Sequence, residues 1–317
     1  MASSFSRAQP PIPSSVSEQA QRFLGQNPGL SGTTPAVDDV DGWLKRIDET
    51  DQYIIQRFIG IELPVAVDDT EIAGVHTYVL GAHDLPPESS SIYLDIHGGG
   101  LISGAGEACR LMSSAGAVTS GMTHWAVDYR MPPLHPYPAS LDDCLAVYRR
   151  LLEERAPQDI FVGGASAGGN LAAALMVRAK DEGLPMPAGL LLLTPEADLT
   201  ESGDSFQTNS GIDNVLGSLM SANLLYANGH DLAHPYLSPL FADVSGFPPT
   251  FLQTGTRDLY LSNTVRMHRK LRAAGVEAEL HVFEAMPHGG FGGAPEDVEV
   301  RMEVRRFLDQ HRRDLPG

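Results

Sequence analysis

Short apolar runs alternate with amphipathic segments from about residue 62 to the end of the chain. Runs of about 4–8 residues rich in branched apolar and aromatic side chains are typical of strands. We therefore expect strands at 75–80, 91–96, 124–129, 159–164, 188–195, 249–255 and 278–284. The central runs are apolar nearly throughout, as expected when both faces of a parallel sheet are buried. The pattern predicts an α/β fold with a mostly parallel central sheet and helices on both faces.

Amphipathic segments predict the helices around this sheet. Asp38 or Asp39 can cap a first helix, and Ser140, with Asp143 three residues later, is typical of the start of a second. A third helix is expected at about 263–274, before Gly275, and a last one at about 296–311. The faces expected to be buried are Val40, Trp43, Leu44 and Ile47 in the first helix, Leu141, Leu145, Tyr148, Leu151 and Leu152 in the second, and Val300, Val304, Phe307 and Leu308 in the last.

Two segments lie outside this alternation. Residues 1 to about 35 are rich in Pro, Ser and Gln, so we expect them to be loosely structured. Residues 204–230 look like a helical insertion, which either packs on the core or forms part of a lid. Its apolar stripe consists of Ile212, Val215, Leu216, Leu219 and Met220. We expect an α/β core in two parts, 61–203 and 233–317. N-terminal cap helices in 1–60 and a cap insertion at 204–232 together form a small helical cap.

Composition excludes several classes of partner. The formal net charge is -18, from 40 acidic and 22 basic residues, and such a surface repels nucleic acid. No uninterrupted apolar run approaches the roughly 20 residues of a membrane span, and the first residues lack the apolar core of a secretory signal. The only two cysteines, Cys109 and Cys144, fit no metal or redox spacing. We therefore expect a cytoplasmic location, no membrane span and no metal.

A candidate nucleophile lies where an expected strand meets an expected helix. Gly164-Ala165-Ser166-Ala167-Gly168 has the pattern G-x-S-x-G in the order strand, turn and helix, which is the context of a nucleophile elbow. Bulky residues two positions before and after Ser166 would clash with the neighbouring strand and helix. The lysine and the Ser/Thr of a phosphate-binding P-loop are missing.

A serine hydroxyl needs a base, and the base needs an orienting acid. In hydrolases with this kind of sheet, the order along the chain is Ser, acid, His. His288 follows the last expected strand in "AMPHGGF", whereas His281 lies inside that strand. Asp258 follows the strand before it, and Glu196 and Asp198 are rival acids one strand earlier.

A glycine-rich loop, His97-Gly98-Gly99-Gly100, directly follows the expected strand at 91–96. Acyl transfer places negative charge on a carbonyl oxygen, which preorganised backbone N–H groups must receive. One such group follows the nucleophile, at Ala167, and Gly98 and Gly99 can supply the others from a loop without side chains. We expect His97 to hold this loop by hydrogen bonds rather than to take part in catalysis.

The ordered motifs resemble the hormone-sensitive-lipase-like group of bacterial esterases (lipolytic family IV) within the α/β-hydrolase fold. The resemblance covers about residues 70–311 and depends on 97–100, "VDYRMPPLHPYPASLDD" at 127–143, 164–170, "GTRDLYLSN" at 255–263 and 271–291. It implies a Ser166–Asp258–His288 triad, an oxyanion hole formed by Gly98, Gly99 and Ala167, and a cap. The chain departs from the family pattern at four places. The family often has Asp where this chain has Ala165, and an aromatic residue where it has Leu101. The segment "PPLHP" lacks a carboxylate that the family has, and Glu196 stands where an apolar or aromatic residue is more usual.

We therefore predict a serine carboxylic ester hydrolase that acts on short- to medium-chain acyl esters through an acyl-enzyme, without a cofactor. A lactone hydrolase of the monoterpene-lactone type with the same triad is an alternative, and a non-catalytic ligand receptor on this fold is another. The partner is then a small-molecule ester or lactone, and a homodimer is left open. The residues expected to line the substrate pocket are Leu101, Ile212, Leu216 and Leu219.

Overall fold

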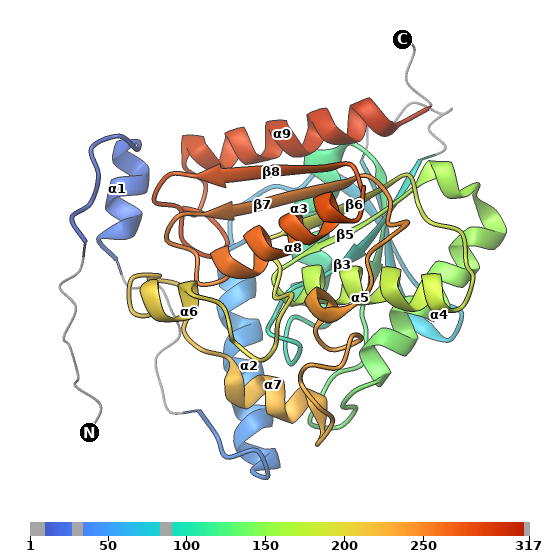
Figure 1. The fold of residues 1–317 in the computed structure, drawn as a ribbon, viewed down its shortest axis with the longest axis horizontal. Coiled ribbons are helices and arrows are strands. Elements are labelled where there is room, and N and C mark those ends of the chain that lie inside the picture. Colours follow the sequence, from blue (N-terminus) through green and yellow to red (C-terminus); the bar gives the residue numbers. More distant parts are fainter. Residues whose placement is uncertain (1–9, 27–33, 83–90, 314–317) are drawn as a thin grey trace.

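The computed structural model describes residues 10–26, 34–82 and 91–313. Within these residues, eight strands form one sheet in the order β1-β2-β4-β3-β5-β6-β7-β8 (Figure 1). The strands are β1 (Val65–Ile72), β2 (Val75–Ala82), β3 (Ile92–Ile96), β4 (Thr123–Val127), β5 (Ile160–Ala165), β6 (Gly189–Leu193), β7 (Thr250–Gly255) and β8 (Ala278–Phe283). The β1–β2 and β2–β4 pairs are antiparallel and all the others are parallel, so the prediction of a mostly parallel sheet is confirmed.

All seven predicted strands are present, and the sequence prediction missed only β1. This strand, "VAVDDTEI", is half polar and mostly exposed, and it lies at the edge of the sheet, where it pairs only with β2. An edge strand that faces solvent lacks the continuous apolar run of the central strands, which explains why its pattern gave no signal.

Helices cover both faces of the sheet (Figure 1). The helices α4 (Ala139–Glu154), α5 (Ala167–Asp181) and α8 (Leu261–Ala273) pack on one face over the largest apolar core. The helices α3 (Glu107–Ser120) and α9 (Pro295–His311) lie on the other, where Phe307 and Leu308 pack on Phe161 and Phe251. The predicted helices at 263–274 and 296–311 are thus confirmed within two residues at each end.

The remaining α-helices among the described residues are α1 (Glu18–Leu24), α2 (Val40–Gln56), α6 (Ser205–Thr208) and α7 (Met220–Ala227). Trp43 of α2 is buried in one cluster with Ala222 and Leu225 of α7, so these two helices pack together at one end of the molecule (Figure 1). In contrast, α1 packs on the end of the core: Ser17 donates to the Glu296 carboxylate at the start of α9. The boundaries of the cap segments remain a prediction.

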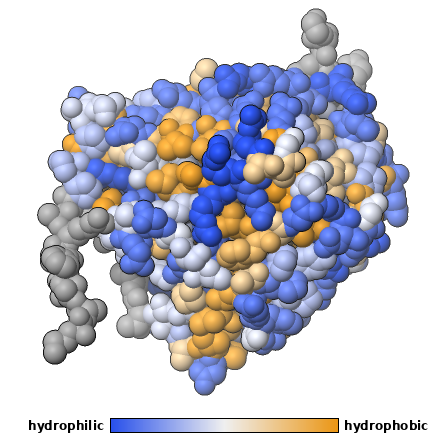
Figure 2. Space-filling model, viewed as in Figure 1, coloured by the Kyte–Doolittle hydropathy of each residue, from blue (hydrophilic) through white to orange (hydrophobic). Residues whose placement is uncertain are grey.

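Part of the predicted inward face of the first helix is wrong. Asp39 does cap α2, since its carboxylate accepts from Gly42 N, and Trp43 is buried. Val40 and Leu44, however, are 45% and 42% exposed. Leu224 of α7 is also exposed, at 45%. Figure 2 shows an apolar area over the place of α2 and α7.

Three further local predictions are wrong. Ser140 does not cap α4, which starts one residue earlier; its hydroxyl donates to Arg130 O, and the Asp143 carboxylate binds Arg130 as well. Residues 209–219 are not helical, because the Asp213 carboxylate accepts from backbone N–H groups of that segment. Residues 1 to about 35 contain α1, capped by Ser17, although 1–9 and 27–33 lie outside the described residues.

Among the described residues, no helix combines the length and apolar character needed to cross a bilayer.

Candidate active site

Ser166 occupies a sharp turn between β5 and α5. Its backbone has φ 58° and ψ -121°, a region that residues with a side chain rarely adopt. The turn is held by hydrogen bonds, from Ser166 N to Leu193 O (2.8 Å) and from Asn170 N to Ser166 O (3.1 Å). Ser166 is partly exposed although the neighbouring residues of α5 are buried. The strained turn therefore presents the hydroxyl at the carboxyl edge of the sheet.

The two glycines of the motif are explained by close packing. A Cβ at Gly164 would lie 2.7 Å from Gly168 O, and one at Gly168 would lie 2.7 Å from His97 O. Both would also clash with Ile96 O, at the end of β3. Real Cβ atoms do not approach backbone this closely, so the elbow packs against β3 only with glycine at both positions.

His288 and Asp258 reach Ser166 from two loops. Ser166 Oγ lies 2.9 Å from His288 Nε2, and His288 Nδ1 lies 3.0 Å from Asp258 Oδ1. The loops follow β8 and β7, and the carboxyl ends of parallel strands meet at one edge of the sheet. With Nδ1 donating to Asp258, Nε2 is free to accept the serine proton. The three predicted residues are thus brought together in the geometry that nucleophile activation needs.

Asp258 is fully buried and well supported. Its Oδ2 accepts from Thr254 Oγ1 (2.7 Å) and its Oδ1 accepts from Tyr260 N (2.9 Å). Thr254, Tyr260 N and His288 therefore hold this carboxylate in a fixed orientation.

Sequence reasoning missed Asp213, which lies in the insertion. Its Oδ2 accepts from Leu259 N (2.8 Å) and from His288 N (3.2 Å), so one carboxylate ties together the loops that carry the acid and the base. Its Oδ1 accepts from Val215 N and Leu216 N. No motif marks this residue, because its partners are backbone groups distant in sequence.

The loop of residues 97–100 lies beside the nucleophile. The β3–β5 register pairs Ile96 with Gly164, and a Cβ at Gly98 would lie 3.5 Å from Ser166 Cβ. Gly99 and Gly100 have φ values of 129° and 63°, which glycine adopts without strain. Gly98 therefore lies beside Ser166, and an oxyanion hole formed by Gly98, Gly99 and Ala167 stays a prediction.

His97 is bound into this loop and does not contact Ser166. Its Nδ1 lies 2.8 Å from Gly98 O, its ring stacks on Tyr129 at 4.0 Å, and the Tyr129 hydroxyl donates to His97 O (2.8 Å). These contacts fix the loop backbone, in agreement with the role expected for His97.

The other candidates are engaged elsewhere. Thr200, Ser202 and Arg266 bind the Asp198 carboxylate. His281 lies within β8 and stacks on Phe251 at 4.6 Å. The third candidate, Glu196, is close enough for its charge to act on His288, but no hydrogen bond joins the two.

Charge around His288 favours the imidazolium. Burial opposes that charge, but Asp258, Asp213 and Glu196 together raise the pKa of His288 above its ordinary value. Burial likewise raises the pKa of Asp213. The site is therefore arranged to stabilise the positive ring that forms when Ser166 loses its proton.

Leu219 of the insertion lies beside the glycine loop, since its Cδ1 would be 3.1 Å from a Cβ at Gly100. Leu216 and Leu219 pack against the cluster of Phe206, Leu259 and Tyr260. Leu101 is completely buried in the main core, and Ile212 is partly exposed. Their role as lining of a substrate pocket remains a prediction.

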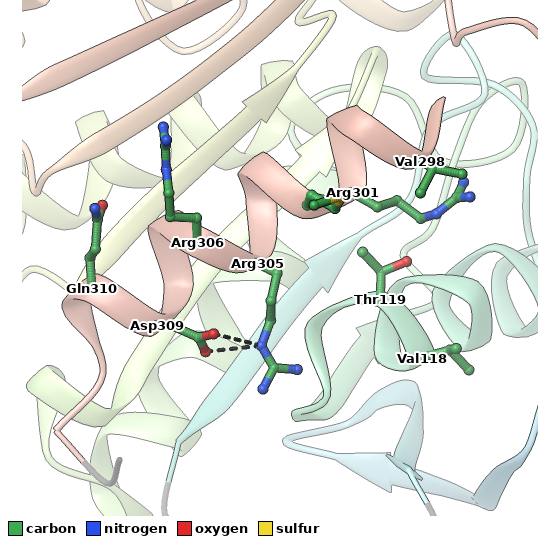
Figure 3. A pocket seen from close by; sticks show the side chains of 9 residues that line it. Val118, Thr119, Val298, Arg301, Arg305, Arg306, Asp309 and Gln310 are labelled. Carbon is green, nitrogen blue, oxygen red and sulfur yellow. Dashed lines mark hydrogen bonds and ion pairs between the residues drawn. The ribbon is translucent and has the colours of Figure 1, made fainter. Parts of the chain in front are cut away.

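A cavity of about 750 Å³ lies elsewhere, between α9 and α3. Figure 3 shows the side chains that line it. Val118, Thr119, Arg301 and Arg305 are among its lining residues, and Arg305 pairs with Asp309. None of its lining residues belongs to the Ser166 site.

Within the described part of the chain, His97, Cys109 and Asp128 place potential metal ligands within 4.8 Å of one another. Burial raises the pKa of the Cys109 thiol well above its ordinary range, and the Asp128 oxygens are already hydrogen-bonded to Gly106 N and His76 Nδ1. This donor set does not fit a metal well, because a bound metal needs a thiolate and a free carboxylate oxygen. The expected absence of a cofactor stays a prediction.

Comparison with known proteins agrees with this geometry. Residues 93–291 match the model of a family described as alpha/beta hydrolase fold. An esterase of Acinetobacter venetianus is 32% identical over 226 residues, which cover 70% of this chain and 74% of that protein. An acetyl-hydrolase of Streptomyces hygroscopicus is 32% identical over 198 residues, covering 62% of this chain and 66% of that protein.

Solved structures are similar over nearly the whole chain. The crystal structure of an esterase E25 has a TM-score of 0.90 and 37% identity, and covers 97% of this chain and 98% of that chain. An esterase from the bacterial hormone-sensitive lipase family has a TM-score of 0.82 and 29% identity, with coverages of 93% and 98%.

A strained serine on an elbow, next to a buried His–Asp pair, defines the serine hydrolases of the α/β-hydrolase fold. The chain belongs to the α/β-hydrolase family and, within it, to the hormone-sensitive-lipase-like group.

Proposed function

We propose that this protein is a serine carboxylic ester hydrolase in which Ser166, His288 and Asp258 carry the reaction. The observation that carries the proposal is the continuous chain of short contacts from Ser166 Oγ through His288 to Asp258, at 2.9 and 3.0 Å. The relatives described above are named as esterases and as an acetyl-hydrolase, which supports this class of activity. They do not favour a lactone hydrolase. The complete triad argues against a non-catalytic receptor.

The reaction follows from the geometry. Ser166 Oγ attacks the ester carbonyl carbon while its proton moves to His288 Nε2, and the carbonyl electron pair becomes an oxyanion facing the amides of Gly98, Gly99 and Ala167. The tetrahedral species collapses, the alkoxide leaves with the proton from Nε2, and an acyl-Ser166 ester remains. Water then attacks this ester and gives its proton to Nε2. The second tetrahedral species collapses, Ser166 Oγ leaves the acyl carbon with the proton from Nε2, and the acid is released. Asp258 keeps the ring oriented and balances its charge throughout.

The test is turnover and covalent labelling of a Ser166→Ala variant. We expect this variant to lose about four orders of magnitude or more of p-nitrophenyl butyrate turnover. It should also lose the adduct that an organophosphate forms in the wild type, measured by intact-protein mass spectrometry. Ser245→Ala, at an exposed serine, is the matched control and should keep both properties. Wild-type turnover or labelling in Ser166→Ala would refute the proposal.

Substrate range is a finer part of the proposal. We expect C2–C6 esters to be hydrolysed better than C12–C16 esters, with Leu216 and Leu219 near the acyl chain because they pack beside the glycine loop and Tyr260. Preferred turnover of long-chain esters or of lactones would contradict this expectation.

Location and assembly are also proposals. Both cysteines are buried and free, which fits a reducing, cytoplasmic compartment, and cell fractionation tests it. A homodimer is tested by light scattering coupled to gel filtration.

A further inference from the structure

One acidic residue beside the site has no role in the mechanism above. Glu196 follows β6, and its backbone is fixed to the nucleophile: Glu196 N donates to Ser166 O (3.1 Å), and Asn170 Nδ2 donates to Glu196 O (2.7 Å). Its side chain is 0% exposed, and the side chains of Tyr260 and Asn223, both neutral, face its carboxyl. A carboxyl buried away from water beside neutral side chains is unfavourable in its charged form, so its position calls for an explanation other than stability.

The surroundings of this carboxyl connect it to His288. The Tyr260 hydroxyl and the Asn223 amide are buried with it and act on it as polar neighbours. The Tyr260 ring meets the His288 ring edge-on, with centroids 5.0 Å apart and planes at 82°. The carboxyl, the phenol and the imidazole therefore form one buried polar group behind the nucleophile.

The charges that face these groups come from several elements. Burial raises the pKa of Glu196 from 4.5 to about 7; Tyr260, Asn223 and His288 oppose this rise, and the nearby Glu201 adds to it. Three carboxyls face His288: Asp258 after β7, Asp213 from the insertion and Glu196 after β6. Asp258 alone touches the ring, and Asp213 is committed to backbone N–H groups.

We propose that Glu196 is a positioning residue whose carboxylate stabilises the His288 imidazolium through space, as a second acid behind the triad. This inference rests on the proposed function. When the Ser166 proton moves to His288 Nε2 and the bond from Oγ to the acyl carbon forms, Glu196 gives up and receives no proton. Above about pH 7, where this carboxyl is ionised, its negative charge lowers the energy of the charged ring in a buried environment, where such an interaction is poorly screened.

The experiment compares the pH profiles of kcat and kcat/KM for wild type and Glu196→Gln. Gln has nearly the same shape but no charge, so the imidazolium loses stabilisation and the pKa of His288 falls. We expect the acid-side midpoint of kcat/KM to move down by about half to one pH unit and the plateau kcat to fall about 3–10-fold. KM for p-nitrophenyl butyrate should stay within about twofold, because Glu196 does not touch substrate.

Further variants separate charge from structure. Glu196→Asp keeps the charge and should keep the wild-type midpoint, whereas Glu196→Leu should behave like Glu196→Gln. Asp204→Asn, which removes an exposed carboxylate eight residues away, is the matched control and should leave the profile unchanged. A midpoint that moves in Glu196→Asp as far as in Glu196→Gln would overturn the proposal.

A direct readout does not depend on turnover. The pKa of His288 can be followed by NMR of ¹³C-labelled histidine, with the signal assigned from His288→Gln. An equal pKa in wild type and Glu196→Gln would overturn the proposal, even if the variant were less active. Organophosphate labelling at Ser166 is recorded in parallel: its absence from the wild type refutes the proposed function, whereas normal labelling with an unchanged pKa refutes only the role of Glu196.

Discussion

Glu196 also makes the stability of the protein depend on pH. Its pKa is about 7 in the folded protein and 4.5 as the ordinary value, so the folded state binds the proton more tightly than the unfolded chain. The sign follows from this difference. The contribution of the protonated carboxyl to stability is fully present below about pH 4.5 and is lost as the pH rises to about 7.

The size follows from the shift. At about 1.4 kcal/mol for each pKa unit, ionised Glu196 lowers the free energy of unfolding by about 3 kcal/mol above pH 7, and about 2 kcal/mol of this loss falls between pH 5.5 and 8.5. Glu196→Gln removes the titration. The variant should therefore gain about 2 kcal/mol relative to wild type over that pH range, whatever its stability at pH 5.5.

Urea unfolding followed by circular dichroism at pH 5.5, 6.5, 7.5 and 8.5 measures this difference. The quantity compared is the change in the free energy of unfolding with pH, so a constant effect of the buried amide cancels. Asp204→Asn should follow the wild-type curve. Parallel curves for wild type and Glu196→Gln would show that the carboxyl does not change its protonation on folding, and the reasoning would fail.

Three further variants test other parts of the site. Gly98→Ala places a Cβ 2.9 Å from Ala165 O and 3.5 Å from Ser166 Cβ, so the loop must move. We expect kcat/KM to fall about 10–100-fold in ester assays, with the melting temperature nearly unchanged. Unaltered activity would show that the loop is not close-packed. Asp213→Asn weakens the acceptor that holds Leu259 N and His288 N, and kcat should fall about tenfold while p-nitrophenyl butyrate binding is kept; a change in KM alone would contradict this role. Trp43→Ala removes the buried side chain between α2 and α7. The free energy of unfolding should fall by about 3–5 kcal/mol, or α2 should become sensitive to limited proteolysis. A variant that is equally stable and equally resistant to the protease would refute the packing described for this helix pair.

The sequence alone was sufficient for the elements whose signals are local. Central strands are apolar along their whole length because both of their faces are buried, and the elbow requires glycine at 164 and 168 because backbone lies where side chains would be. His288 and Asp258 could be placed because they follow strands whose carboxyl ends meet at one edge. The prediction of an ester hydrolase and the resemblance to the hormone-sensitive-lipase-like group depended on these residues.

Other features depended on contacts between segments distant in sequence. Ser140 and Asp143 have the pattern of a helix start, yet both bind Arg130, which lies in the loop after β4. The apolar stripe at 212–220 has helical spacing, but the Asp213 carboxylate takes the backbone donors of that segment and also holds His288 and Leu259. Local helix propensity does not decide the structure where a side chain forms hydrogen bonds with partners elsewhere in the chain.

The sequence by itself determined the parallel sheet, the elbow and the candidate nucleophile and base, because each is encoded by steric requirements within a few residues. Only the tertiary structure showed that, of the three candidate acids, Asp258 makes the hydrogen bond to His288, and that Asp213 joins the two loops. It also showed that Glu196 is fully buried beside the nucleophile, with Tyr260 and Asn223 facing its carboxyl. Distances between side chains and their removal from water are set by the packing of the whole chain, and no local pattern carries that information.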